Sequence, residues 1–273
     1  MIHIKKIFIN FFIYLIKMKN KFYIFTLIKI LYSSMSIASL NSKRNLFVGT
    51  AGDYKPVSFY DNNTKTYSGI DIEISKLFAK EKNYNLVFIK TSWPNLMQDT
   101  LLNKFDFAIC GITKTEARLE KALMSVGYLK AGKTFLMRKE DVEKYKTISD
   151  VDKSTVRVII NPGGTNEKFA NEFLTHANKT IHPINEEIPS LISKGIGDIM
   201  VTEVMEGLVY IKEFDNLAIP LYKTPFTNQD IGVLFNKKNT EIFNEFNPWL
   251  ESKLNDGTID KIKKEFIPEP EIN

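Results

Sequence analysis

Cysteine and histidine are scarce in this sequence. Cys110 is the single cysteine among 273 residues, which excludes an intramolecular disulfide and any zinc or iron–sulfur site built from several cysteines. His3, His176 and His182 are the only histidines, so little is left for a histidine-based metal site. We therefore expect no bound metal.

Several catalytic motifs are also missing. The sequence contains no G-x-S-x-G, no H-E-x-x-H and no C-x-x-C. The run GGTNEK at residues 163–168 lacks the G-K-[ST] of a phosphate-binding loop, which argues against Walker-type nucleotide binding. Its backbone N–H groups at a helix start would suit a carboxylate. The alternative is an ordinary turn and helix cap.

Acidic residues are absent from residues 1–44, which hold eight lysines and arginines. The formal net charge of +5 therefore belongs to this leader, because the remainder carries 29 basic against 32 acidic residues. A basic, nucleic-acid-binding body is not supported. Hydrophobic residues at 44% and charged residues at 25% fit a globular protein with a buried core.

The leader has the layout of a secretory signal. Its apolar runs at residues 7–16 and 22–31 each fall short of the roughly 20 apolar residues that a membrane-spanning helix needs. Met18 offers a second start, and small residues at 36–38 have the spacing of a cleavage site. We predict a signal peptide or N-terminal anchor over residues 1–40 and a periplasmic or secreted protein, with no membrane contact beyond this leader.

The body alternates between predicted strands and helices. We expect strands at 45–50, 85–90, 105–111, 157–160, 198–201 and 231–235, and helices at 69–82, 93–104, 164–177, 187–194, 204–213, 242–255 and 259–266. This order predicts an α/β fold of two lobes, each a mostly parallel sheet flanked by helices, with a cleft between them.

The late strands return to the first half of the chain. We therefore assign 45–136 and 231–267 to lobe 1, 137–230 to lobe 2, and 268–273 to a mobile tail. Ligands of open α/β sheets sit at the carboxyl ends of strands. That rule places four segments at the cleft, namely 49–54, 110–118, 161–166 and 202–206.

Charged residues in these segments suggest a site for an acid. Arg118 follows a buried strand and could hold a carboxylate bidentately, helped by the Thr113 hydroxyl. The alternative for Arg118 is a solvated helix residue. Glu203 and Glu206 would share a helix face at i and i+3, where they could bind an ammonium group or supply a general acid. The alternative is an acidic helix start favoured by the helix dipole.

Aromatic residues accompany the charged ones. Tyr54 and Trp93 could wall a ring-bearing ligand or belong to the core, and Asp53 could be a turn residue or a polar cleft group. Cys110 lies in an apolar strand and is expected to be inert.

The segment from Gly111-Ile112-Thr113 to Arg118 resembles the carboxylate-binding motif of the type 3 periplasmic solute-binding proteins, and the likeness covers residues 45–267. It implies a type II periplasmic-binding-protein-like fold. Three further runs resemble the cyclohexadienyl dehydratase family, which is built on this scaffold. They are GDYKP at 52–56, TSWPNLM at 91–97 and NPGGTNEKFA at 161–170, joined by YLKAGKT at 128–134.

The narrower resemblance implies a reaction and roles for residues. It implies dehydration and decarboxylation of prephenate to phenylpyruvate, or of L-arogenate to L-phenylalanine, without a cofactor. Glu206 would be the general acid, and Asn161 would help hold the departing hydroxyl and the acid. The implied substrate-binding residues are Asp53, Tyr54, Trp93, Thr113, Arg118, Gly164, Thr165 and Glu203.

Position 203 departs from the family pattern, which has Asp there. The extra methylene carries the carboxylate about 1.3–1.5 Å further into the cleft, which bears on the preference for arogenate's ammonium group. The competing interpretation is an amino-acid receptor of a transporter that performs no chemistry. Either way we expect a small-molecule ligand and no nucleic acid, while the oligomeric state stays open.

Overall fold

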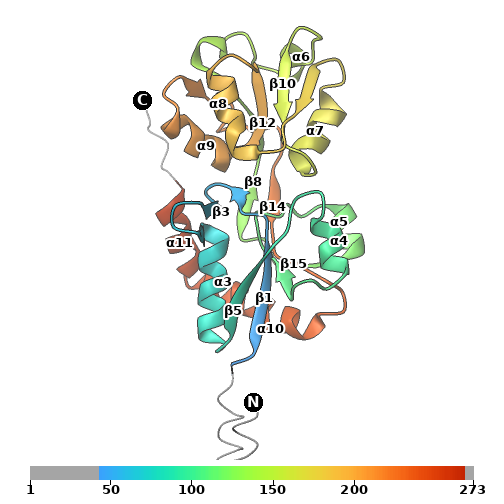
Figure 1. The fold of residues 1–273 in the computed structure, drawn as a ribbon, viewed down its shortest axis with the longest axis vertical. Coiled ribbons are helices and arrows are strands. Elements are labelled where there is room, and N and C mark those ends of the chain that lie inside the picture. Colours follow the sequence, from blue (N-terminus) through green and yellow to red (C-terminus); the bar gives the residue numbers. More distant parts are fainter. Residues whose placement is uncertain (1–42, 268–273) are drawn as a thin grey trace, which may run out of the picture. The chain divides into compact units, whose positions relative to one another are not determined.

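A computed structural model describes residues 43–267 of the chain (Figure 1). The predicted leader and the predicted tail at 268–273 lie outside the described residues. Between residues 43 and 267 no helix combines the length and the apolar composition needed to cross a bilayer.

The first lobe is built on a five-stranded sheet in the order β5-β1-β6-β15-β7. β1 (Asn45–Thr50) lies parallel to β5 (Asn85–Lys90) on one side and to β6 (Phe107–Ala108) on the other. β15 (Leu234–Phe235) runs antiparallel to β6 and to β7 (Leu123–Met124). The sheet is therefore parallel except for β15.

The second lobe repeats this arrangement in the order β11-β10-β12-β9-β13. β10 (Arg157–Ile160) lies parallel to β11 (Asn178–Ile181) and to β12 (Ile199–Glu203). β9 (Lys133–Arg138) is the reversed strand, antiparallel to β12 and to β13 (Leu217–Ala218). The α/β fold of two lobes with mostly parallel sheets is thus confirmed.

Two strands carry the chain between the lobes. β8 (Leu129–Ala131) and β14 (Gln229–Ile231) pair antiparallel, and Figure 1 shows them between the two sheets. Each leads into the reversed strand of the lobe that it enters, β9 or β15. We predicted lobe 1 to continue to residue 136, but β9 pairs with the second sheet from Lys133 onward.

The helices flank these sheets. Lobe 1 carries α3 (Ile70–Glu81), α4 (Leu96–Leu101), α5 (Glu116–Lys121), α10 (Thr240–Asn255) and α11 (Thr258–Phe266). Lobe 2 carries η1 (Lys139–Asp141), α6 (Ile148–Val151), α7 (Thr165–Phe173), η2 (Asn185–Glu187), α8 (Ile188–Ser193) and α9 (Val204–Glu213). A small antiparallel sheet of β2 (Asp53–Tyr54), β3 (Ser58–Asp61) and β4 (Thr66–Ser68) was not predicted.

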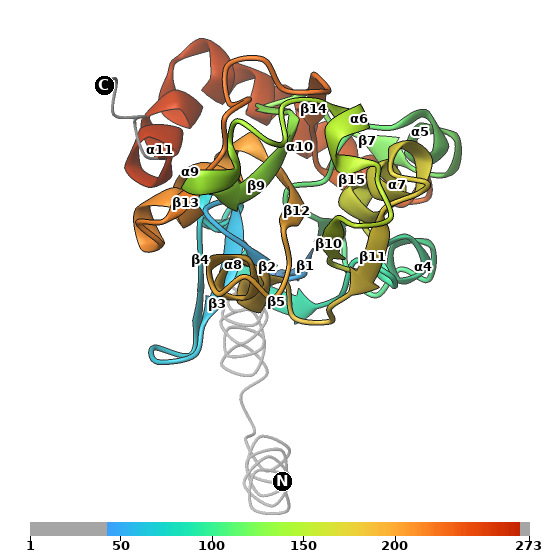
Figure 2. The same cartoon turned by 90° about the horizontal axis from the view of Figure 1, so that it is seen from above.

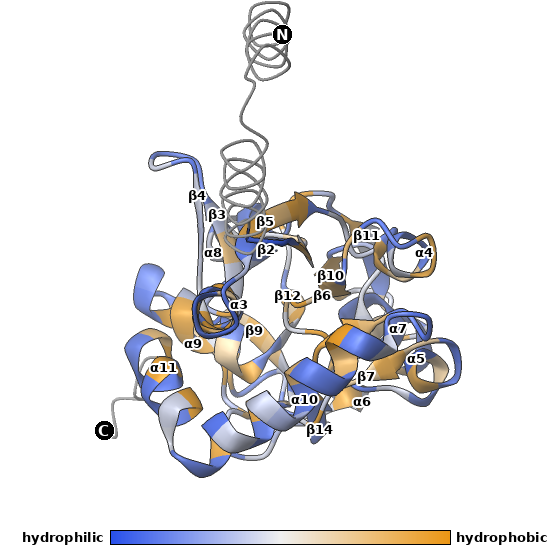
Figure 3. Ribbon diagram, turned by 90° about the horizontal axis from the view of Figure 1, so that it is seen from below, coloured by the Kyte–Doolittle hydropathy of each residue, from blue (hydrophilic) through white to orange (hydrophobic). Residues whose placement is uncertain are grey.

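The core of lobe 1 forms because one face of α3 is apolar. Ile70, Ile74 and Phe78 recur at helical spacing and are fully buried. The Phe78 ring meets Phe246 edge-on at 4.7 Å and Trp249 at 5.0 Å between ring centres, which joins α3 to α10. In Figure 3 β5 is coloured hydrophobic, while hydrophobic and hydrophilic residues alternate along α10.

Strand alternation divides the core of lobe 2 between two faces. Val158 and Ile160 pack with Phe169 of α7, whereas Ile159 between them packs with Ile188 of α8. Seen from above, β9, β12, β10 and β11 follow one another across the lobe (Figure 2). Helices on both faces leave the carboxyl ends of β10 and β12 free to face lobe 1.

Candidate active site

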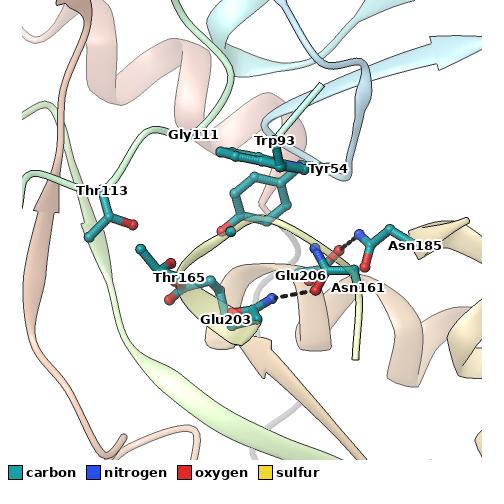
Figure 4. A pocket seen from close by; sticks show the side chains of 11 residues that line it. Tyr54, Trp93, Gly111, Thr113, Asn161, Thr165, Asn185, Glu203 and Glu206 are labelled. Atoms are coloured by element: carbon teal, nitrogen blue, oxygen red, sulfur yellow. Dashed lines mark hydrogen bonds between the residues drawn. The ribbon is translucent and has the colours of Figure 1, made fainter. Parts of the chain in front are cut away.

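A small cavity lies between the two lobes. Lobe 1 lines it with Tyr54, Trp93, Gly111 and Thr113, and lobe 2 with Asn161, Gly164, Thr165, Asn166, Asn185, Glu203 and Glu206 (Figure 4). Its volume of about 30 Å³ is room for about two water molecules. A ring-bearing acid needs several times that space. The lobes must therefore separate for such a ligand to enter.

Tyr54 and Trp93 form the aromatic side of the cavity. Their rings meet edge to face with centres 6.4 Å apart, and Trp93 Nε1 donates a hydrogen bond of 3.0 Å to Asp53 Oδ1. The buried Tyr54 hydroxyl has no hydrogen-bond partner among residues 43–267. Gly111 makes this position of Tyr54 possible, because a Cβ at residue 111 would lie 2.3 Å from the Tyr54 ring.

Arg118 is a buried cation without an acidic partner in the described part of the chain. Its Nη1 donates to the Thr113 carbonyl oxygen at 2.6 Å, and the residue is 9% exposed. Burial lowers its pKa below the usual range. Because an uncompensated buried charge is costly, the guanidinium is a strong candidate to receive a carboxylate. It contacts the backbone of Thr113 and is not part of the cavity lining.

Glu206 is a fully buried carboxyl in the first turn of α9. It accepts hydrogen bonds from Thr202 Oγ1 at 2.5 Å, Asn185 Nδ2 at 2.6 Å and the Tyr210 hydroxyl at 3.1 Å. These bonds favour the ionised form, but burial outweighs them and raises the pKa of Glu206 to about 7. Near neutral pH much of Glu206 is therefore protonated, as a general acid must be.

Glu203 is in a different situation. It is the last residue of β12 and precedes α9, so it does not share a helix face with Glu206 as predicted. Lys133 Nζ donates to Glu203 Oε1 and also to Thr165 Oγ1, the latter at 2.7 Å. The neighbouring charge that helps to raise the pKa of Glu206 is Asp53.

The segment after β10 supplies the remaining wall. Asn161 is buried, and its Oδ1 accepts a hydrogen bond of 3.3 Å from Asn166 Nδ2. Gly164 precedes α7, which begins at Thr165. The Gly163 N–H donates to Glu167 Oε2 at 2.5 Å, so the chain's own carboxylate takes one of the N–H groups expected for a ligand.

The structure brings most of the predicted site residues together. All of them line the cavity except Asp53, which is bonded to Trp93, and Arg118. Cys110 is buried in the core of lobe 1, where burial raises the pKa of its thiol, as expected for an inert residue.

Asn185 and Lys133 are the important residues that the prediction missed. Asn185 Nδ2 donates both to Glu206 Oε1 and, across the lobe boundary, to the Asp53 carbonyl oxygen at 3.0 Å. No motif marks Asn185 in the sequence. Lys133 was visible in the run YLKAGKT, but its partner Glu203 lies 70 residues further along the chain.

Similar proteins include an enzyme as well as receptors. The model of the bacterial extracellular solute-binding proteins, family 3, matches residues 46–269. Cyclohexadienyl dehydratase of Pseudomonas aeruginosa is 36% identical over 181 residues, covering 66% of this chain and 67% of that protein. The L-cystine-binding protein TcyA of Bacillus subtilis is 25% identical over 234 residues, covering 85% and 84%.

A solved structure extends the likeness to three dimensions. The crystal structure of the ancestral amino acid-binding protein AncCDT-1, a precursor of cyclohexadienyl dehydratase, has a TM-score of 0.75 and 33% identity. The match covers 82% of this chain and 96% of that one. Because one scaffold serves both binding and catalysis among these relatives, the function must be argued from the site.

Proposed function

The chain belongs to the bacterial extracellular solute-binding proteins, family 3, and from this premise we propose that it is a cofactor-independent dehydratase of prephenate, L-arogenate or both. The observation that carries the proposal is Glu206. A receptor that only holds an amino acid has no need of a second, protonated carboxyl in its pocket. The membership in an extracellular family also suits the predicted export of the chain.

The reaction needs one proton and a fixed orientation of the ring. Glu206 donates its proton to the ring hydroxyl as the carbon–oxygen bond breaks, and water leaves. The bond between the ring and its carboxylate breaks as carbon dioxide leaves, and its electron pair completes the aromatic ring. Prephenate gives phenylpyruvate and arogenate gives phenylalanine. Glu206 remains as a carboxylate and regains a proton from solvent.

The other residues have binding roles in this proposal. Tyr54 and Trp93 pack against the ring, and Arg118 with Thr113 holds a substrate carboxylate. Asn161 lies on the Glu206 side of the cavity in Figure 4 and contacts the departing hydroxyl. Gly164 and Thr165 close the wall beside it. Separation of the lobes admits the substrate, and closure excludes water from the acid.

The test is turnover by residues 41–273 of prephenate and of arogenate without added metal or cofactor, followed as phenylpyruvate and phenylalanine. We expect Glu206→Gln to lower kcat at least about a hundredfold, which is the usual contribution of a general acid. Calorimetry should show retained product binding, because Gln keeps the shape. In the wild type, kcat/KM should fall as the pH rises through about 7, where Glu206 of the free protein loses its proton.

A matched control is Glu172→Gln, which changes an exposed carboxyl on α7. Near-wild-type kcat in Glu206→Gln would remove Glu206 from the mechanism. The second candidate is an amino-acid receptor, favoured by the receptors among the relatives. No turnover of either substrate, together with tight amino-acid binding, would establish that function instead.

A further inference from the structure

We infer that the Lys133–Glu203 pair makes the site selective for an α-keto acid over the α-amino acid with the same skeleton, so that prephenate and not arogenate is the substrate. This inference rests on the proposed function. The two substrates differ at one group, a keto oxygen in prephenate and an ammonium in arogenate. The question is therefore which carboxylate of the site is free to receive an ammonium.

Two carboxyl groups line the cavity, and both are engaged. Glu206 accepts three hydrogen bonds, from Thr202, Asn185 and Tyr210. Glu203 receives the ammonium of Lys133. Asp53, just outside the cavity lining, accepts the indole N–H of Trp93. Each of these three carboxyl groups therefore already receives at least one hydrogen bond from the protein.

Lys133 is built into the site. Its side chain is 2% exposed and that of Glu203 is 6% exposed, so solvent screens the pair very little. The Thr165 hydroxyl accepts a second hydrogen bond from Lys133 Nζ, which fixes the ammonium beside the cavity wall. Lys133 thus gives Glu203 an ammonium partner, which is the group that an amino-acid ligand would otherwise supply.

One carboxylate oxygen at the cavity still lacks a hydrogen-bond donor, and the cations around it determine which ligand group can bind there. Glu203 Oε2 is buried and has no hydrogen-bond partner in the described part of the chain. An ammonium placed there would be a second cation on one carboxylate. Arg118 lies close enough that its charge also acts on Lys133. A ligand without an ammonium adds no positive charge, and its carboxylates suit the uncompensated guanidinium of Arg118.

The alternative is that a ligand ammonium displaces Lys133. Lys133 would then be a buried cation without a partner, and separating a buried ion pair is among the costlier changes in a protein. We therefore expect kcat/KM to be about a hundredfold higher for prephenate than for arogenate.

The test compares kcat/KM for the two substrates in the wild-type protein. A ratio of tenfold or more in favour of prephenate supports the inference, and a smaller or reversed ratio overturns it while leaving the dehydratase function intact. If neither substrate turns over, the proposed function fails. Calorimetry with phenylpyruvate and L-phenylalanine then still decides the inference, with the same tenfold threshold.

Lys133→Met locates the cause of the selectivity. This variant frees Glu203 to receive an ammonium, so the prephenate-to-arogenate ratio should fall at least tenfold relative to the wild type. The control Lys168→Met, at an exposed lysine on α7, should keep the wild-type ratio. An unchanged ratio in a folded Lys133→Met protein overturns the assignment to this pair.

Glu203→Gln covers the case in which Lys133→Met does not fold. It removes the carboxylate and keeps the side-chain length. The inference expects the preference for prephenate to persist or increase, because no ammonium depends on Glu203. If arogenate turnover exists and is lost selectively in this variant, Glu203 binds the substrate ammonium and the inference is wrong.

Discussion

Asp71 is a buried carboxyl with a structural role beside the site. It accepts hydrogen bonds of 2.6 Å from the Gly111 N–H and from the Tyr128 hydroxyl, and burial raises its pKa from 3.8 to about 7. Through Gly111 it fixes the backbone against which Tyr54 packs. The folded state therefore binds a proton at pH values where the unfolded chain does not.

This difference makes stability depend on pH. A carboxyl whose folded pKa is raised contributes stability that is fully present below its unfolded pKa and is lost as the pH rises through its folded pKa. For Asp71 we expect the free energy of unfolding to fall by about 2–3 kcal/mol between pH 5 and pH 8. Glu206 acts in the same direction.

Asp71→Asn separates the two contributions. Its amide oxygen can accept from the Gly111 N–H, and its NH₂ group can donate to the Tyr128 hydroxyl. Urea unfolding at several pH values should show a smaller decline for this variant than for the wild type. Parallel pH profiles of the two proteins would contradict the role assigned to Asp71.

At this same scale, the site residues that follow strand ends could be predicted from the sequence. Each of these residues lies within a few positions of the end of a strand that an apolar run predicts. They are Tyr54, Thr113, Asn161 and Glu203. Asn185 could not be predicted, because it stands in a 3-10 turn and acts through contacts with residues distant in sequence. The pairing of Glu203 with Lys133 could not be predicted either, because the two residues lie 70 positions apart in the sequence.

Among the elements, the turn that precedes α7 packs closely against lobe 1. Gly163 has a positive φ of +84°, and a Cβ there would lie 2.5 Å from the backbone nitrogen of Pro94 in lobe 1. We expect Gly163→Ala to hold the lobes apart and lower kcat/KM at least about tenfold, as misplacement of a site by an ångström does.

Gly195→Ala is the matched control for Gly163→Ala. Gly195 also lies in lobe 2 with a φ of +73°, but the nearest atom to its Cβ position is Arg138 Nη1 at 3.8 Å. Both variants pay a backbone cost of about 1–2 kcal/mol. Only Gly163→Ala should lose activity. Similar losses in the two variants would mean that backbone strain, and not the contact with Pro94, is responsible.

Elements with a clear period could be predicted, and the short ones could not. β1, β5, β10 and α9 have the predicted bounds because each is an apolar run or a helical stripe on a packed face. The strands β2, β3 and β4 are two to four residues long and half-buried, so they show no period. The strand expected at 231–235 is divided at Gly232 into β14 and β15.

For the whole molecule, the closed arrangement is held by a few contacts across the cleft. Lys55 of lobe 1 and Glu213 of lobe 2 form an ion pair of 2.8 Å, with side chains 31% and 40% exposed. Asn185 adds its hydrogen bond to Asp53. Exposed ion pairs contribute little to the free energy of unfolding. Because these contacts join the two lobes, we expect them to affect the equilibrium between open and closed forms instead.

Glu213→Gln tests that balance. Losing one exposed pair of about 0.2–1 kcal/mol should raise KM up to about fivefold and leave Tm nearly unchanged. The control is Glu73→Gln, which removes a pair of the same length with Lys76 inside lobe 1. A shift of KM in both variants would indicate an effect of net charge and not of this pair. An unchanged KM in Glu213→Gln would show that the pair does not contribute to closure of the lobes.

The paired crossing strands β8 and β14 also set the order in which the lobes can be completed during synthesis. All strands of lobe 2 lie within residues 133–218, so that lobe is whole before the end of the chain leaves the ribosome. The sheet of lobe 1 lacks β15, which lies between β6 and β7, until residue 235 has been made. The lobe that begins first is therefore finished last, and a truncation before β15 leaves a gap inside its sheet.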